Sequence, residues 1–373
     1  MRTSTLKTPP RTPAAKATAA RPGPARPGRA AITLRLAGER VALRLPVRPI
    51  AVGAVLALLA VVLLALTVAV GHFALPLPDL IEVLTGGGRR ADRFIVLERR
   101  LPRAVAALLV GAALGTAGAV FQSLTRNPLG SPDFIGLAAG ASVGAVISIT
   151  MLGGGQLRNT GFALVGCLVT GLLIYLLAYR DGVTGYRLVL VGIGMNALGL
   201  AVVHWLLTRA RIDDAATAQS WLVGNLNNRS WGHVVPLAVV AVPAAAVLLW
   251  LRRRLDLLEM GDDAASALGI PIGRTRLVLF AVAVVLTAFA VSVAGPIAFV
   301  ALAAPQIARR LTRTPGAALG TAALTGACLL LAGDLASREV FAPTQLPVGV
   351  ATAALGGAYL CWLLTRQWRR GRG

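Results

Sequence analysis

Apolar segments of about 20 residues recur from residue 50 almost to the end of the chain, and they constrain its fold more than any other feature. An α-helix needs this length to cross a lipid bilayer, because it rises only about 1.5 Å per residue. Only 14% of the 373 residues are charged, whereas a soluble domain carries about a quarter. The sequence therefore predicts an all-α polytopic membrane protein.

Ten membrane-spanning helices can be placed on these segments, which gives a single transmembrane domain over 50–366. They are expected near 50–70, 101–121, 134–152, 161–179, 186–208, 234–251, 276–295, 297–309, 317–334 and 346–364. The preceding residues, 1–49, are rich in Pro, Ala and Arg and contain one acid, Glu39, so we expect a disordered basic tail. A short basic tail follows at 367–373.

An even number of spans places both ends of the chain on the same side of the membrane. If that side is the cytosol, most of the 37 Lys and Arg residues lie in cytosolic segments, as the positive-inside rule requires. We therefore expect a multi-pass protein of the plasma (inner) membrane, surrounded by membrane lipids, with both tails in the cytosol. This distribution also accounts for the net charge of +22, so nucleic acid is not an expected partner. The exception is the first outer loop, which contains Arg89, Arg90, Arg93, Arg99, Arg100 and Arg103.

The sequence argues against an enzyme. Its three histidines are scattered, and its three cysteines lie in apolar segments without the spacing of a metal site. Both lysines, Lys7 and Lys16, lie in the N-terminal tail, so a Walker A phosphate loop cannot form. No span has an acid near its centre, which argues against a proton- or sodium-coupled carrier. We expect no cofactor and no metal, and another chain must hydrolyse any ATP; a secondary carrier and a membrane enzyme are the alternatives.

Residues 100–137 combine an apolar helix, a sharp polar turn and a second apolar helix. The first helix has small residues on one side, at Gly111, Ala112, Gly115 and Gly118. Small residues let helix backbones approach closely in lipid. In the turn, Pro128 ends the helix and pushes the preceding Asn127 out of the helical region. Asn127 and Leu129 are therefore expected at the cytosolic mouth of the bundle, either in a capped reversal or as a constriction.

The longest inner loop, 252–275, contains a short predicted helix at 262–268. Asp262 and Asp263 occupy its first turn, where acids suit the helix dipole, and Gly269 ends it. Its apolar residues share one face. This helix is either a surface helix lying on the membrane or a docking site for a cytosolic partner.

Four blocks of the chain, in order, resemble the iron-siderophore and vitamin B12 permeases of ABC importers, the FecCD-type family. They are RLPRAVAALLVGAALGTAGAVFQSLTRNPLGSPDFIGL at 100–137, GDDAASALGIP at 261–271, GPIAFVALAAPQIARRLT at 295–312, and GDLASR with LPVGVATAALGGAYLCWLL at 333–338 and 346–364. In the third block Gln306 stands where the family usually has His, and no role follows for it. The segment WLVGNLNNRSW at 221–231 resembles part of the ferric enterobactin permeases, with Asn225 in place of the usual Ser.

The resemblance covers about 50–366 and implies a type II ABC importer permease with ten spans. It implies import of ferric siderophores, catecholate-like ones in particular, with cobalamin or haem import as the alternative within the family. The implied partners are a cytosolic ATPase dimer, an extracytoplasmic substrate-binding lipoprotein and a second permease subunit, either a copy of this chain or a paralogue.

The resemblance also assigns residues to three sites. The residues that would dock the binding protein are Arg100, Arg103 and Arg338. Those of the cytoplasmic gate are Asn127, Leu129, Thr184 and Gly185. The segment that would couple to the ATPase runs over 261–269 and includes Gly261, Asp262, Ala264, Leu268 and Gly269. Outer arginines that meet carboxylates on a partner would explain why the first outer loop breaks the positive-inside rule.

Overall fold

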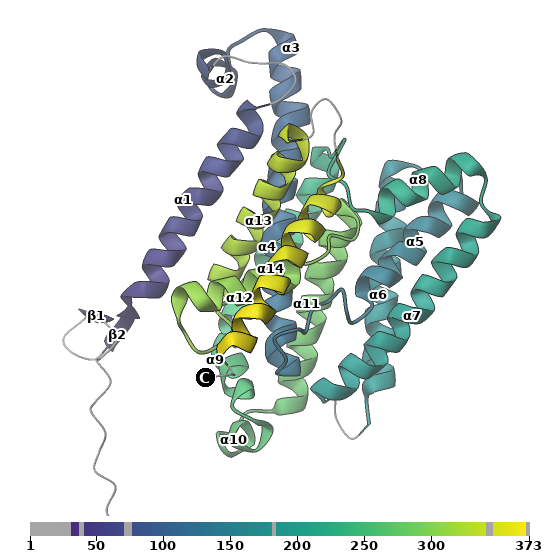
Figure 1. The fold of residues 1–373 in the computed structure, drawn as a ribbon. Helices are drawn as coiled ribbons and strands as arrows, with labels where there is room; N and C mark the ends of the chain where they lie inside the picture. The colour runs from purple at the N-terminus through teal and green to yellow at the C-terminus, as the bar shows by residue number, and fades with distance from the viewer. Residues whose placement is uncertain (1–30, 37–40, 71–76, 181–183, 341–345, 371–373) are drawn as a thin grey trace, which may run out of the picture. The chain divides into compact units, whose positions relative to one another are not determined.

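The computed structural model describes residues 31–36, 41–70, 77–180, 184–340 and 346–370. It divides into two units, Met1–Val47 and Arg48–Gly373 (Figure 1). The first unit contains two strands, and the second is built from helices.

Two strands lie within residues 1–49, for which the disordered tail stays a prediction. β1 (Ala31–Leu36) and β2 (Val41–Pro46) pair antiparallel, with Leu34 opposite Leu43. Apolar residues recur at every second position in both strands, which is the period of a β-strand. The overall composition of the tail gives no indication of this short alternation. The other residues before α1 lie outside the described residues.

Each of the ten predicted spans coincides with a helix. These helices are α1 (Val47–Ala69), α4 (Leu101–Thr125), α5 (Leu137–Met151), α6 (Gln156–Ala178), α7 (Gly185–Arg209), α9 (Trp231–Glu259), α11 (Ile272–Ala294), α12 (Val300–Thr312), α13 (Leu319–Glu339) and α14 (Val348–Arg370). Among the described residues, seven of them are long and apolar enough to cross a membrane, namely α1, α4, α6, α7, α9, α11 and α13. α5 and residues 348–359 of α14 are shorter apolar helices, and α12 has 13 residues.

Several shorter helices connect the long ones. The predicted helix in the longest inner loop is present as α10 (Asp262–Ala267). Four further helices are not predicted from the sequence: α2 (Leu77–Leu84), α3 (Arg90–Arg93), the π-helix η1 (Phe94–Arg100) that runs into α4, and α8 (Ile212–Leu222). Three of these helices carry an acid in the first turn that suits the helix dipole: Asp79 in α2, Asp92 in α3 and Asp213 in α8.

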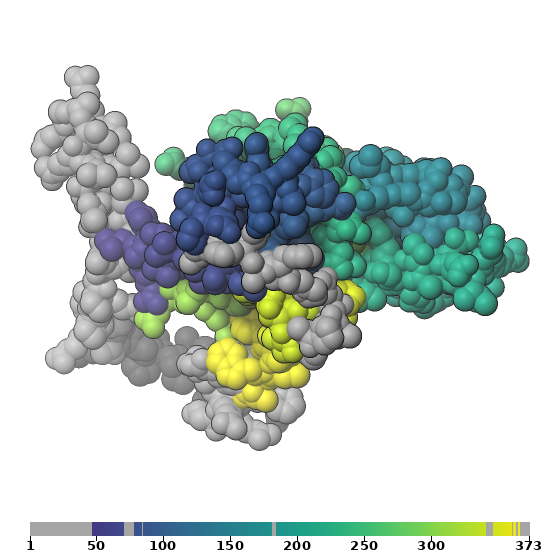
Figure 2. Space-filling view, turned by 90° about the horizontal axis from the view of Figure 1, so that it is seen from above, coloured from purple at the N-terminus to yellow at the C-terminus, as the bar shows by residue number. Residues whose placement is uncertain are grey.

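α4 is the most buried of the seven long apolar helices, with 72% of its apolar window inside the protein. It packs against α9, α11, α12 and α13, which surround it in Figure 1. α5, α6, α7 and α8 form a neighbouring block, and the view from above in Figure 2 shows this block in teal to one side. One end of α4 is covered by the residues drawn in blue in Figure 2, where Val83 and Val96 are buried with Ala104.

The small side of α4 is in backbone contact with its neighbours, which confirms the close packing predicted from its glycines. A Cβ atom on Gly111 would lie 2.4 Å from the carbonyl oxygen of Gly326 in α13. A Cβ atom on Gly118 would lie 1.8 Å from the carbonyl oxygen of Ala301 in α12. Both distances are far below van der Waals contact, so only glycine permits this approach, and van der Waals packing is what holds helices together in lipid.

We expect Gly326→Ala to destabilise the bundle and Gly320→Ala, on the same helix, to leave its stability unchanged. A Cβ atom on Gly326 would lie 2.1 Å from the carbonyl oxygen of Gly111, whereas one on Gly320 meets no atom within 4 Å. Overpacking of this kind typically costs about 1–3 kcal/mol. Thermal unfolding of both variants in detergent measures the difference, and equal melting temperatures would contradict the tight contact between α4 and α13.

Candidate functional site

The turn after α4 is shaped by Arg126 and Asn127. Arg126 caps α4 in the left-handed region, with φ 49°, so the chain reverses there. The Oδ1 atom of Asn127 accepts a hydrogen bond from the Leu129 backbone N–H at 2.9 Å, and its carbonyl oxygen accepts one from Gly130 at 2.9 Å. Leu129 itself is 55% exposed. Of the two gate residues predicted here, Leu129 therefore presents an apolar surface and Asn127 folds the turn.

The second predicted gate segment lies against the same end of α4. Thr184 is extended and precedes α7, which begins at Gly185. A Cβ atom on Gly185 would lie 2.8 Å from the Leu124 carbonyl oxygen and 2.8 Å from the Cα atom of Thr125, so the two backbones touch. The structure thus brings together two segments that lie almost 60 residues apart in the sequence. Their role as a gate stays a prediction.

α10 is joined to the turn through one carboxylate. Asp262 accepts hydrogen bonds from Arg126 of the turn and, at 2.7 Å, from Arg276 of α11. Burial by itself would raise the pKa of Asp262, but the hydrogen bonds and charges of Arg276 and Arg126 outweigh it and hold the pKa below its ordinary value. The carboxylate is therefore ionised at neutral pH and engages both arginines at once.

The other predicted coupling residues differ in exposure. Leu268 is 61% exposed and Ala264 is half-buried, whereas Ala265, which the sequence analysis does not single out, is fully buried. Gly261 and Gly269 flank the helix with φ values of 123° and 76°, which L side chains rarely adopt. α10 therefore packs on the bundle through Ala265 and presents Leu268 on its exposed side.

A second carboxylate links the end of α9 to α4 and α12. Glu259 accepts hydrogen bonds from the Ser123 hydroxyl and, at 3.3 Å, from Arg309. Arg309 also donates to the Ser123 hydroxyl oxygen at 3.2 Å, and Arg126 donates to the Leu258 carbonyl oxygen at 3.0 Å. The sequence analysis assigns no role to Ser123, Glu259 or Arg309, because only the fold brings these three helices to one place.

Gln306, for which no role follows from the sequence, contacts the turn directly. Its Nε2 donates a hydrogen bond to the Pro128 carbonyl oxygen at 2.7 Å, and only 9% of the residue is exposed. A cavity of about 200 Å³ lies beside this contact, lined by Gln122, Arg126, Asn127, Pro128, Glu259 and Arg309. Gln306 therefore fastens the turn to α12 next to an open space.

At the opposite end of α4, the three arginines predicted to dock a partner all contact groups of the chain itself. Arg103 and Arg338 both form ion pairs with Asp334 of α13, at 2.8 and 3.3 Å, and Asp334 is fully buried. Arg100 donates to the carbonyl oxygens of the last two residues of α1, both at 3.0 Å. A docking role for these arginines stays a prediction, and Arg103 and Arg338 have a structural role beside it.

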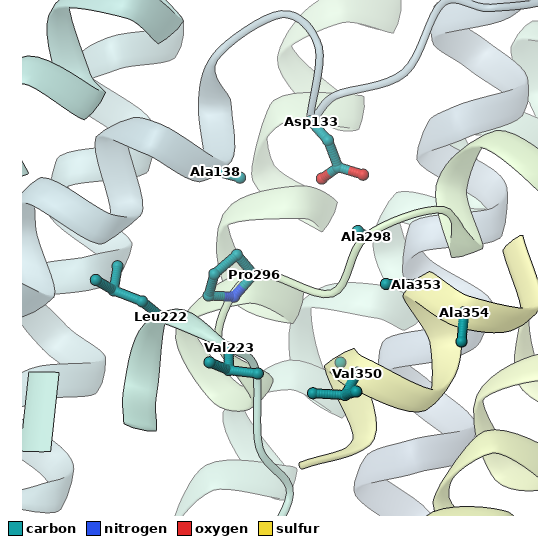
Figure 3. Close-up of a pocket in the computed structure, with 10 residues that line it drawn as sticks. Asp133, Ala138, Leu222, Val223, Pro296, Ala298, Val350, Ala353 and Ala354 are labelled. Atoms are coloured by element: carbon teal, nitrogen blue, oxygen red, sulfur yellow. The ribbon is translucent and has the colours of Figure 1, made fainter. Parts of the chain in front are cut away.

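Two cavities flank the segment 221–231. An apolar cavity of about 550 Å³ is lined by Asp133, Ala138, Leu222, Val223, Pro296, Ala298, Gly349, Val350, Ala353 and Ala354. Figure 3 shows the Asp133 carboxylate pointing toward Pro296 and Ala298, and its Oδ1 atom has no hydrogen-bond partner among the described residues. A polar cavity of about 380 Å³ includes Asn225 and Arg229 in its lining. Within the described part of the chain, no group of His, Cys, Asp and Glu side chains could hold a metal ion.

The chain matches known transport proteins along most of its length. The model of the FecCD transport family matches residues 57–366. The ferric enterobactin transport system permease protein FepG of Escherichia coli (strain K12) is 46% identical over 300 residues, which cover 80% of this chain and 91% of that protein. The probable siderophore transport system permease protein YfhA of Bacillus subtilis (strain 168) is 36% identical over 318 residues, covering 81% of this chain and 93% of that protein.

A solved structure has the same fold. It shows an inward-facing conformation of a metal-chelate type ABC transporter and superposes with a TM-score of 0.76 at 25% sequence identity. The match covers 85% of this chain and 99% of the other.

We expect Gln306→Leu to loosen the turn and Gln306→His to keep it in place. Leucine leaves the Pro128 carbonyl oxygen without its donor, whereas an imidazole N–H can still donate. A neutral hydrogen bond contributes about 1 kcal/mol, so amide exchange over 126–136 should rise about fivefold in the leucine variant. Hydrogen–deuterium exchange measures this rise, with Gln219→Leu on the exposed face of α8 as the control. Equal exchange in all three variants would contradict the contact.

Proposed function

The chain belongs to the FecCD transport family, and we propose that it is the permease subunit of an ABC importer that carries ferric siderophores across the plasma membrane. The observation that carries this proposal is the 46% identity to the ferric enterobactin permease FepG. This relative favours catecholate siderophores, and the similarity of 221–231 to the same group agrees with it. A separate ATPase dimer would drive transport, since the only lysines of the chain lie in its N-terminal tail.

We propose ten membrane crossings, made by the seven long apolar helices together with α5, α12 and α14. Short helices are tolerated at membrane depth where protein rather than lipid surrounds them, and both α5 and α12 are largely buried. The distribution of Arg and Lys supports cytosolic ends for the chain. In this orientation, α10 and the turn after α4 face the cytosol, and Asp334 lies near the outer surface.

The sites then divide between the two surfaces. On the cytosolic side, α10 would receive the ATPase, and the turn 126–130 with Thr184 and Gly185 would form the gate. A second permease subunit, a copy or a paralogue, would complete the pathway. α7 has room for such a contact, because only 17% of its apolar window is buried in a single chain, the same share as in α1. Its exposed side chains include Leu190, Ile193 and Leu198, which would meet lipid or the second subunit.

On the outer side, we propose that Arg100, which is half-buried against the end of α1, contacts the substrate-binding lipoprotein. Arg103 and Arg338 are committed to Asp334, with side-chain exposures of 14% and 9%. They would hold the docking surface in shape, and Arg100 would meet carboxylates of the partner.

Deletion of the gene should abolish ATP-dependent uptake of a ferric catecholate siderophore, and complementation should restore it. Uptake of radiolabelled iron measures this, and uptake of cobalamin and haem is followed in parallel. Loss of cobalamin or haem uptake with intact ferric-siderophore uptake would assign the other substrate. Uptake into vesicles that lack the ATPase would contradict the importer and favour a secondary carrier.

Charge reversal at Arg100 should weaken docking of the binding lipoprotein, and because it also removes two hydrogen bonds to the end of α1, the melting temperature in detergent is measured beside capture. Loss of an interfacial ion pair typically costs about 2–5 kcal/mol of binding, so capture of the lipoprotein by Arg100→Glu should fall at least tenfold. Arg253→Glu makes the same charge change on an exposed residue at the opposite end of the bundle and is the control. Equal capture by both variants would contradict the role given to Arg100.

A further inference from the structure

The chain near the coupling helix allows movement at both ends of α10. Gly261 precedes the helix and Gly269 follows it, and a Cβ atom built on either glycine would meet no atom within 4 Å. The helix has only 6 residues, and Ala265 is its one fully buried residue. Side-chain contacts therefore determine where α10 sits, and Asp262 makes the ionic ones.

Asp262 pairs with two arginines in different surroundings, a buried one in α11 and a more exposed one in the turn after α4. Arg276, on its α11 side, is 10% exposed in its side chain. Arg126, on its other side, is 39% exposed and is the first residue of the turn 126–130. That turn holds together as a unit through the two hydrogen bonds of Asn127.

A cavity lies beside the turn, and two of the residues that line it carry buried polar atoms without a hydrogen-bond partner among the described residues. The cavity of about 200 Å³ is lined by Gln122 and Arg309, among others. Within the described residues, the Oε1 atom of Gln122 and the Nε atom of Arg309 are buried without a hydrogen-bond partner. Unpaired buried polar atoms are rare in native structures. A second position of the turn could satisfy them.

We propose that Arg126 is the positioning residue that transmits movement of α10 to the turn 126–130, so that ATP hydrolysis opens the pathway. This inference rests on the proposed function, because the ATPase must act on α10. Movement of Asp262 displaces Arg126 directly, and Arg126 is also hydrogen-bonded to the Leu258 carbonyl oxygen at the end of α9. The hydrogen bonds of Glu259 with Ser123 and Arg309 hold the end of α4 to α9 and α12 while the turn moves.

Because the Arg126–Asp262 ion pair is exposed to water, its role in transport can be measured apart from any role in folding. Arg126 and Asp262 are 39% and 40% exposed, and ion pairs this open to water contribute little to folding. Removal of the Arg126 side chain also loses the hydrogen bond to the Leu258 carbonyl oxygen, which contributes about 1 kcal/mol, so the melting temperature should fall by only a few degrees. A large loss of transport in such a variant cannot then be attributed to unfolding.

The test uses the complete importer, with its ATPase, second permease subunit and binding protein, reconstituted in liposomes. Arg126→Gln should hydrolyse ATP at close to the wild-type rate but import about tenfold less of a ferric catecholate per ATP, a typical size for coupling between two sites. Arg253→Gln, an exposed residue of α9 outside these contacts, is the matched control and should behave as wild type.

A double-mutant cycle with Asp262→Asn makes the test independent of any loss of folded protein. If the two residues act through one contact, the second substitution adds little to the transport defect of the first. Wild-type transport per ATP in Arg126→Gln, or additive defects in the double variant, would overturn the proposal. Loss of ATP hydrolysis together with transport would assign Arg126 to ATPase docking instead. Absence of ATP-driven uptake in the wild-type complex would reject the proposed function itself.

Discussion

Backbone contact between α4 and its neighbours is the constraint on which the rest of the structure depends. Gly111 meets Gly326 of α13, and Gly118 meets Ala301 of α12, at distances that leave no room for a side chain. Because these contacts are between backbones, they cannot be adjusted by changing a rotamer. They set the height of α12 and α13 along α4, and so they set where Gln306 and Asp334 lie relative to the two ends of α4.

The two ends of α4 use charge in opposite ways. Asp334 is fully buried and is compensated by Arg103 and Arg338, and loss of one partner from such a group leaves an uncompensated charge in the interior. Asp262 and Arg126 meet in contact with water, where an ion pair is weak and easily exchanged. The ion pairs at the Asp334 end of the bundle are therefore costly to break, whereas the pair at the Asp262 end is not. This difference suits a transporter that must open one side while the other keeps its shape.

The sequence was sufficient for the long helices, because each one requires an apolar stretch, and for the close contact of α4, because Gly111 and Gly118 recur on one helical face. It was not sufficient for β1 and β2, whose short alternation is outweighed by the composition around it. It also did not reveal the contacts of Glu259, since Ser123 lies 136 residues away and Arg309 lies 50 residues away. The family resemblance identified Arg103 and Arg338. It did not identify Asp334, which forms ion pairs with both arginines.

The contact at Gly118 also restricts how this chain can change over evolutionary time. Glycine is the smallest residue, so any substitution there adds volume, and no further change on α4 can remove it. The displacement must be absorbed by α12, which carries both Gln306 and Arg309. A single added methyl group at Gly118 would thus shift Gln306, which holds the turn, and Arg309, which holds the end of α4, roughly one to two helical turns away along α12. Substitution of Gly118 is therefore disfavoured twice, by the clash with Ala301 and by the displacement of the hydrogen-bonding residues of α12.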